Sequence, residues 1–238
     1  MWHKAFLEEC RRAGFNLAGI ASVTSYDSST PEPLRLARRF SGARSALILA
    51  TGGTSFWNSL AQREKSCSHP LDRATVHRLR KPVRFLRRQG VCHRILFPFR
   101  SSGLKVSFRR LAEASGLGNA NTVLNILVHP VYGPWVSLRA LILVDQVLEP
   151  TVPLTEFDPC APCAKPCIRA CPSNAIRTTG FELRLCGIHI SKFPSCDEGC
   201  LARRACVYGK EHAYSGNEGF HRQRFAKQAI LQYLARES

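Results

Sequence analysis

The cysteines of this 238-residue chain are concentrated near its end, where eight of the eleven lie between residues 160 and 206. The first four follow the spacing C-x2-C-x3-C-x3-C-P, a lone cysteine comes next, and a looser C-x3-C-x5-C group closes the stretch. Closely spaced thiolates with a further cysteine before a proline are typical of [4Fe–4S] ligation, and two such clusters need eight ligands. The sequence therefore predicts two [4Fe–4S] clusters, with the candidate ligands Cys160, Cys163, Cys167, Cys171, Cys186, Cys196, Cys200 and Cys206.

Zinc and disulfide bonds are the alternative uses of such an array. Structural zinc sites usually take four ligands from two separated pairs, whereas the run from Cys160 to Cys171 packs four cysteines together and ends in Cys-Pro. Disulfide frameworks belong to oxidising compartments, and the first ten residues lack the apolar stretch and cleavage site of a secretory signal. A cytoplasmic location is therefore expected, and zinc is the stronger of the two alternatives.

The chain is strongly basic, with a formal net charge of +17, and most of its basic residues are arginine. A charge balance of this kind attracts polyanions, nucleic acid among them. The basic residues are scattered except for a run over residues 78–88, whose helical spacing also fits an ordinary solvent-exposed helix face. A tRNA or another polyanion is thus one candidate partner, with an acidic protein or plain solubility as the alternatives. No apolar run approaches the roughly 18 residues of a membrane-spanning helix.

Apolar periodicity predicts an α/β domain over residues 1–150 and a cysteine-rich module over residues 151–238, joined by a proline-rich link at 148–159. Helices alternate with short buried strands, and the last two strands are close enough to pair as a hairpin, which favours a mixed α+β sheet sandwich. We expect strands at 17–21, 45–50, 91–97, 124–128 and 138–145. We expect helices near 1–14, 34–40, 108–115 and 71–90, the last kinked or split by Pro82.

The segment between the last two expected strands, from His129 to Trp135, combines His, Tyr, Trp, Gly and two prolines in seven residues. Aromatic side chains on a rigid turn next to a redox module suit the surface of a flat cofactor. A tight hairpin whose Trp135 fills the core explains the same residues equally well.

Several of these motifs resemble the epoxyqueuosine reductases, which are cobalamin- and iron–sulfur-dependent enzymes of tRNA modification. The resemblance is carried by Gly116-Leu117-Gly118, by the segment from Leu127 to Leu138 with its His-Pro-x-Tyr-Gly-x-Trp core, by residues 41–45 and by the eight-cysteine module. The hairpin and the sequence His69-Pro70-Leu71-Asp72 are also similar to the cobalamin-processing chaperones.

The resemblance implies a nitroreductase-like sheet domain that holds a corrinoid, followed by a ferredoxin-like module with two clusters. By the family pattern, one cluster is ligated by Cys160, Cys163, Cys167 and Cys206. The other cluster is ligated by Cys171, Cys186, Cys196 and Cys200. Cys171 and Cys206 then cross over between the two halves of the module.

The same resemblance implies cobalamin contacts from His129, Tyr132, Gly133 and Trp135. Asp72 is the nearest acidic candidate for a catalytic proton donor, and its alternative role is to cap the helix that follows. The leftover cysteines have no partners at ligand spacing and are expected to be free thiols that ligate no iron: Cys10, Cys67 and Cys92.

The predicted function is an epoxyqueuosine reductase-like oxidoreductase that passes electrons through two [4Fe–4S] clusters to a corrinoid or small substrate. Its electron donor is expected to be of the flavodoxin or ferredoxin type. The alternative is a ferredoxin-like carrier whose first domain only docks partners. A tRNA-directed enzyme, favoured by the basic charge, is a third possibility.

Overall fold

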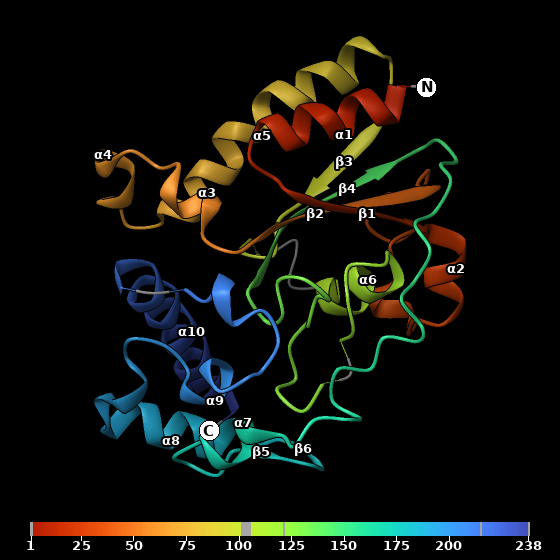
Figure 1. The fold of residues 1–238 in the computed structure, drawn as a ribbon. Helices are drawn as coiled ribbons and strands as arrows, with labels where there is room; N and C mark the ends of the chain where they lie inside the picture. The colour runs from red at the N-terminus through yellow and green to blue at the C-terminus, as the bar shows by residue number, and fades with distance from the viewer. Residues whose placement is uncertain (1, 101–105, 121, 215, 238) are drawn as a thin grey trace. The chain divides into compact units, whose positions relative to one another are not determined.

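The computed structural model describes residues 2–100, 106–120, 122–214 and 216–237 (Figure 1). The chain forms two compact units. The first unit is made of Met1–Gly118 and Val136–Thr155, and the second of Asn119–Trp135 and Glu156–Ser238. Residues 119–135, which the sequence analysis placed in the first domain, therefore lie in the cysteine-rich unit.

The first unit is built on a four-stranded sheet of order β1-β2-β4-β3, in which every pair of neighbouring strands is antiparallel. Its strands are β1 (Leu17–Ser22), β2 (Ser45–Gly52), β3 (His93–Leu96) and β4 (Val136–Val144). The register of β2 against β4 shifts between Leu49 and Ala50. The α+β fold predicted from the sequence is confirmed, with a sheet that is antiparallel throughout its described strands.

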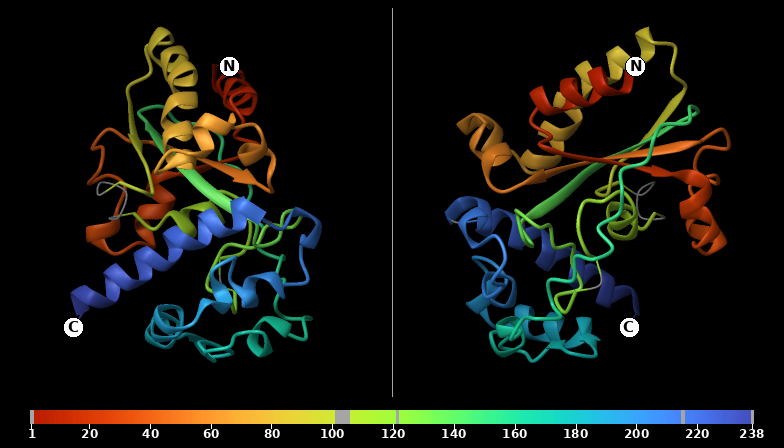
Figure 2. Two further views of the ribbon diagram at one scale, coloured as in Figure 1. Left: turned by 90° about the vertical axis from the view of Figure 1, so that its left-hand side faces the viewer. Right: turned by 45° about the vertical axis from the view of Figure 1, so that its right-hand side comes forward.

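Helices cover both faces of this sheet (Figure 2). Helices α1 (Trp2–Arg12) and α5 (Pro70–Arg88) lie on one face, while α2 (Val23–Ser28) and α6 (Phe108–Ala114) lie on the other. All eight residues of β2 are buried, which is why this strand reads as a continuous apolar run and not as an alternating one. The short elements of the unit are α3 (Ser55–Asn58), α4 (Gln62–Lys65) and the 3-10 turn η1 (Glu32–Leu34).

Helix α5 is continuous over 19 residues and contains Pro82 in its interior. The expected split at Pro82 is therefore wrong, although the proline leaves the carbonyl of Arg78 without its usual intrahelical donor. Pro82 is tolerated because it lies on the buried face of the helix, together with Leu79 and Leu86. Packing of this face against the sheet outweighs one lost hydrogen bond.

The helix expected at residues 34–40 does not form. The buried carboxylate of Asp27 instead accepts the backbone N–H groups of Leu36 at 2.7 Å and Ala37 at 3.0 Å. A side chain that takes up these donors stabilises a non-helical backbone locally.

The strand expected at residues 124–128 is also wrong. Thr122 Oγ1 donates to the carbonyl of Ile126, and Asn125 adopts φ 55°, so this stretch turns back on itself. Leu124 is buried among the cysteines of the second unit. Strand β4 therefore pairs with β2 and β3, and the expected hairpin between 124–128 and 138–145 is absent from the described sheet.

The second unit consists of short elements followed by two longer helices, α8 (Leu183–Lys192) and α10 (Gly216–Glu237), which pack against each other. A two-stranded ribbon of β5 (Ile176–Arg177) and β6 (Gly180–Phe181) lies between α7 (Pro166–Arg169) and α8 in the sequence. The remaining elements are α9 (Leu201–Arg204) and the 3-10 turns η2 (Pro194–Cys196) and η3 (Lys210–His212).

Among the described residues, no helix combines the length and the apolar character that crossing a membrane would require.

Candidate functional site

Four cysteines of the second unit line one small cavity: Cys160, Cys163, Cys167 and Cys206. The loop that carries the first of them begins at Asp158, whose Oδ1 accepts the backbone N–H groups of Cys160 at 2.9 Å and Ala161 at 3.1 Å. Lys165 then adopts φ 51° and starts helix α7, which carries Cys167. The loop is thus folded so that cysteines distant along the chain meet at a common cavity.

The thiols of this first set act on one another electrostatically. Burial raises the pKa of Cys167, and negative charge on Cys206, Cys160 and Cys163 raises it further. Burial likewise raises the pKa of Cys206, where Cys160 and Cys163 add to the shift. The mutual effect follows from proximity, because like charges within a few ångströms disfavour ionisation.

A second set contains the other four cysteines of the array. Burial raises the pKa of Cys186 to about 11, and the charges of Cys200, Cys171 and Cys196 contribute to the rise. Burial also raises the pKa of Cys200, to which Cys196 adds. We refer to these two groups as the first site (Cys160, Cys163, Cys167, Cys206) and the second site (Cys171, Cys186, Cys196, Cys200).

Each site therefore draws on both halves of the cysteine array. Cys171 belongs to the C-x2-C-x3-C-x3-C-P run but interacts with Cys186. Cys206 belongs to the later group but lines the cavity of the first site. The eight cysteines thus fall into two groups of four, one around this cavity and one around Cys186. Among the described residues, no three His, Cys, Asp or Glu side chains are arranged to hold a single metal ion.

Several hydrogen bonds reach the sulfur of Cys171. Burial alone raises the pKa of Cys171, but donors from Ser173 Oγ and from the backbone N–H groups of Ile176, Ser173 and Ala175 outweigh it, so that the net pKa is lowered. The side-chain contact joins Cys171 Sγ and Ser173 Oγ at 3.4 Å. At the first site, the backbone N–H of Lys165 donates to Cys163 Sγ at 3.3 Å.

The hairpin predicted to contact a corrinoid is a tight turn closed by two backbone hydrogen bonds of 2.8 Å between His129 and Gly133. The Nδ1 atom of His129 accepts hydrogen bonds from the backbone N–H groups of Val131 at 3.0 Å and Tyr132 at 3.2 Å. Burial lowers the pKa of His129, and the neighbouring His212 lowers it further. His129 is therefore held neutral with Nδ1 unprotonated, and Nε2 carries the proton.

Gly133 is required by the packing of this turn. Its φ is 53°, and a Cβ built at this position would lie 2.1 Å from the carbonyl oxygen of Tyr208. Gly209, on the segment that the turn packs against, is equally restricted, because a Cβ there would lie 2.4 Å from the carbonyl carbon of Tyr132. Gly133, expected to contact cobalamin, thus makes its close backbone approach to residues 208–209 of the chain itself.

Trp135 is buried, with 3% of its surface exposed. Its ring meets that of Tyr214 edge-on at 5.2 Å, and the guanidinium of Arg203 lies 5.0 Å from both ring centroids. Within the second unit Trp135 is thus a packing residue, in keeping with the alternative in which it fills the core. Tyr132 is less buried, and its ring centroid lies 4.7 Å from that of His212 and 5.2 Å from that of His129, with the rings tilted at 54° and 49°.

Asp72 lies in the first turn of α5, two residues after its first residue Pro70, so it is not the N-cap, which is His69. Its Oδ1 accepts from Arg139 Nη2 of β4 at 3.3 Å, and Arg139 is largely buried. Asp72 lines a cavity of about 790 Å³. Other residues of this cavity include Arg63, Cys67, Arg73, His77, Arg80, Phe99 and Arg100.

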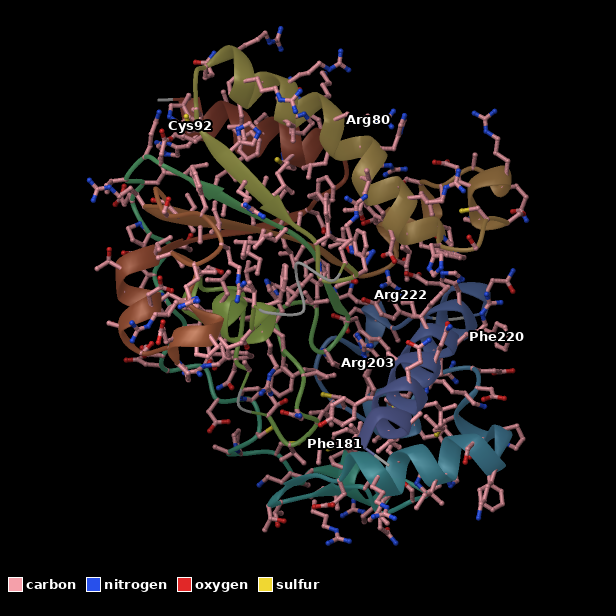
Figure 3. All side chains as sticks on the ribbon, turned by 180° about the vertical axis from the view of Figure 1, so that it is seen from behind. Arg80, Cys92, Phe181, Arg203, Phe220 and Arg222 are labelled. Carbon is pink, nitrogen blue, oxygen red and sulfur yellow. The ribbon has the colours of Figure 1, made fainter. Side chains whose placement is uncertain are left out.

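A further cluster, which the sequence patterns did not predict, lies beside Cys200 of the second site. Arg203 and Tyr214 contact Trp135. Arg222 lies over the Tyr214 ring at 4.0 Å and is paired with Glu218 at 2.8 Å. Arg222 belongs to α10, and Figure 3 labels it together with Arg203. The sequence feature that points to this cluster is the pair Arg203-Arg204 between Cys200 and Cys206.

The fold of this chain is that of the epoxyqueuosine reductases, and reductive dehalogenases share it. A crystal structure of selenomethionine-labelled epoxyqueuosine reductase matches 94% of this chain and 70% of its own length, with a TM-score of 0.67 and 17% identity. The Bacillus subtilis epoxyqueuosine reductase matches with 17% identity and a TM-score of 0.65, over 89% of this chain and 66% of its own.

Two further structures extend the comparison. An epoxyqueuosine reductase with an epoxyqueuosine-modified tRNA stem-loop covers 97% of this chain and 81% of its own, with a TM-score of 0.64 and 15% identity. A reductive dehalogenase described as B12-dependent covers 96% of this chain but 35% of its own, with a TM-score of 0.61 and 16% identity. No family model and no curated protein matches the sequence. At these identities the likeness shows the fold.

Proposed function

We propose that this chain is an iron–sulfur reductase that carries electrons through two [4Fe–4S] clusters to a corrinoid or small substrate. The observation that supports this proposal best is the division of eight thiols into two sets of four. The division is not that of the sequence order, because Cys171 and Cys206 exchange sets. Two clusters would explain this exchange, since Cys171 and Cys206 would then link the two halves of the unit through the metal sites.

The residues present fit such clusters. Thiolate is the ligand that iron–sulfur clusters prefer, and each site offers four thiols. At the first site these thiols surround a cavity that also has apolar walls from Leu124 and Val128. When bound, the clusters would supply one-electron transfer. The chain's own contribution is to exclude water from the sulfurs and to hydrogen-bond them.

A corrinoid is the proposed electron acceptor, and the hairpin from His129 to Trp135 is its proposed contact. Fold likeness to a reductive dehalogenase described as B12-dependent supports this choice. Gly133 and Trp135 stabilise the hairpin through packing. Tyr132 would offer the corrinoid a ring face, and the Nε2–H of His129 would offer it a hydrogen-bond donor. Flat cofactors need apolar walls with a few placed polar groups, and these two side chains are of that kind. Asp72, in the cavity of the first unit, remains the proposed proton donor.

Cobalamin binding tests this function. Anaerobically reconstituted protein is expected to bind cobalamin in calorimetry with a dissociation constant of tens of micromolar or lower, equivalent to about −6 to −7 kcal/mol. Tyr132→Ala is expected to weaken binding at least ~10-fold, about 1.4 kcal/mol, because it removes the ring face. The control is Tyr233→Ala, an exposed tyrosine of α10. Wild-type protein with full iron content and no cobalamin binding would favour the electron-carrier alternative.

A polyanionic partner, proposed to be RNA, is supported by the distribution of charge. The first unit contains 22 of the 34 basic residues and nine of the 17 acidic ones. On α5, Arg73, His77, Arg80, Arg84 and Arg88 are exposed at intervals of three or four residues, which gives a row about 22 Å long. Figure 3 shows Arg80 projecting from the outside of this helix. Fold likeness to a reductase solved with a tRNA stem-loop also supports RNA.

The salt dependence of RNA binding checks this partner. For an RNA stem-loop, the double variant Arg80→Gln/Arg84→Gln is expected to reduce the slope of log K against log salt by about 1.5, because two phosphate contacts are lost. The matched control is Arg11→Gln/Arg12→Gln on α1, which removes equal charge from arginines already paired with Glu8. Equal slopes for the two double variants would mean that the α5 row does not contact RNA.

A further inference from the structure

Arg203 lies midway between two candidate iron ligands, three residues after Cys200 and three before Cys206. Part of the residue reaches the surface, but its guanidinium Nε is sealed from solvent and makes no hydrogen bond. Its Nη2 donates to the carbonyl of Pro134, and its guanidinium carbon lies 5.0 Å from the ring centroids of both Trp135 and Tyr214. Packing on two rings holds the charge in a fixed place.

This cation has no carboxylate to neutralise it. In the described part of the chain, no Asp or Glu oxygen lies within 4.0 Å of Arg203, whereas the neighbouring Arg222 is paired with the buried Glu218. Keeping a guanidinium away from water without a counter-charge is costly. Cys200 lines the same small cavity as Arg203, Trp135 and Tyr214, so this charge lies beside a candidate ligand of the second site.

The two sites differ in this respect. At the first site, the cation that acts on a ligand is Lys210, which acts on Cys206 and is exposed to solvent. Water and salt screen an exposed charge, whereas a charge packed between two rings acts through a medium of lower dielectric. Sulfurs of both sites take part in hydrogen bonds, Cys163 with the N–H of Lys165 at 3.3 Å and Cys171 with Ser173 Oγ at 3.4 Å, so the packed charge is what distinguishes the second site. Hydrogen bonds and positive charge near the sulfurs both favour the reduced state of a cluster.

We propose that Arg203 makes the second site the more easily reduced of the two clusters, so that an electron entering the protein rests there. This inference depends on the proposed function, because it requires both clusters. The step is a single-electron transfer: a flavodoxin- or ferredoxin-type donor loses one electron, the second site gains it, and no proton or ligand is exchanged. Arg203 acts on the site through Cys200 and is a positioning and potential-setting residue.

The test is a potentiometric titration of reconstituted protein followed by electron paramagnetic resonance. Signals of the second site are assigned with Cys186→Ser, which changes one of its ligands. In Arg203→Met, which keeps contact with the rings but removes the charge, the reduced-to-oxidised ratio of the second site at fixed potential is expected to fall at least ~10-fold, equivalent to 59 mV. The first site is expected to shift less than threefold. The control is Arg204→Met, an exposed neighbour on the same helix.

A second variant keeps Arg203 in place. Glu218→Gln removes the charge that neutralises Arg222, which itself interacts with Arg203. The added positive charge is expected to raise the same ratio at the second site several-fold. Full iron content with an unchanged second site in both variants would overturn the inference and leave the proposed function standing. Protein without iron or acid-labile sulfide would overturn both.

Discussion

Gly133→Ala is expected to destabilise the second unit by at least ~3 kcal/mol and to prevent it from retaining iron. Two effects combine. A left-handed backbone conformation costs a residue with a side chain about 1 kcal/mol, and the φ of 53° at Gly133 is in that region. The larger effect is steric, because the new Cβ would lie 2.1 Å from the carbonyl oxygen and 2.6 Å from the carbonyl carbon of Tyr208. Backbone cannot turn aside as a flexible side chain can, so the turn must move away from residues 208–209.

Gly216→Ala separates these two effects. Gly216 has nearly the same φ, 51°, but its Cβ would meet nothing within 4 Å. This variant is expected to lose only about 1 kcal/mol and to keep its iron. The melting temperature and the rate at which a chelator bleaches the visible absorbance measure both variants. If Gly133→Ala behaves like Gly216→Ala, the crossing of 133 over 208–209 is not needed to hold the unit together.

The cysteine variants are expected to fall into two groups that cut across their order in the sequence. Cys171→Ala should abolish the same electron paramagnetic resonance signals as Cys186→Ala. Cys206→Ala should abolish the same signals as Cys160→Ala. Each variant should retain about four of the roughly eight irons expected for two [4Fe–4S] clusters, or fewer if the unit loosens. The reason is that Cys186 interacts with Cys171, and Cys206 shares a cavity with Cys160.

The matched control removes the three cysteines outside the array. Cys10 is buried in the core of the first unit, where burial raises the pKa of its thiol, so alanine is the suitable replacement there. The triple variant Cys10→Ala/Cys67→Ser/Cys92→Ser is expected to keep all its iron. Two results would contradict the assignment. One is iron loss in the triple variant, and the other is that Cys206→Ala and Cys186→Ala lose the same electron paramagnetic resonance signals. Stoichiometric zinc without acid-labile sulfide would exclude the clusters altogether.

The sequence was a good guide where one local pattern decided the structure. The amphipathic repeat of α5, with apolar residues such as Leu79 and Leu86 on one side, predicted a helix that the structure contains. The unbroken apolar run of β2 predicted a buried strand, which is correct because both sheet faces are covered. It was a poor guide where a distant group competed, as when Asp27 takes up the N–H groups of Leu36 and Ala37.

Residues 124–128 show the same limit more clearly. Leu124, Leu127 and Val128 look like a strand because they are apolar and closely spaced, but periodicity does not say which surface buries them. In the structure, Leu124 packs with Cys167 and Cys171. The hairpin that follows therefore belongs to the cysteine-rich unit and not to the sheet. Trp135 is part of that unit for the same reason.

The sequence by itself determined the number and kind of candidate ligands, because eight thiols at close spacing restrict the chemistry whatever the fold. It also determined the helical and buried-strand segments whose periodicity is local. The tertiary structure decided which thiols share a site, since Cys171 and Cys206 exchange groups only when the chain folds back. It also decided that Arg203 lies between Trp135 and Tyr214 beside Cys200. Residues so far apart in the chain meet through packing, which spacing along the sequence does not encode.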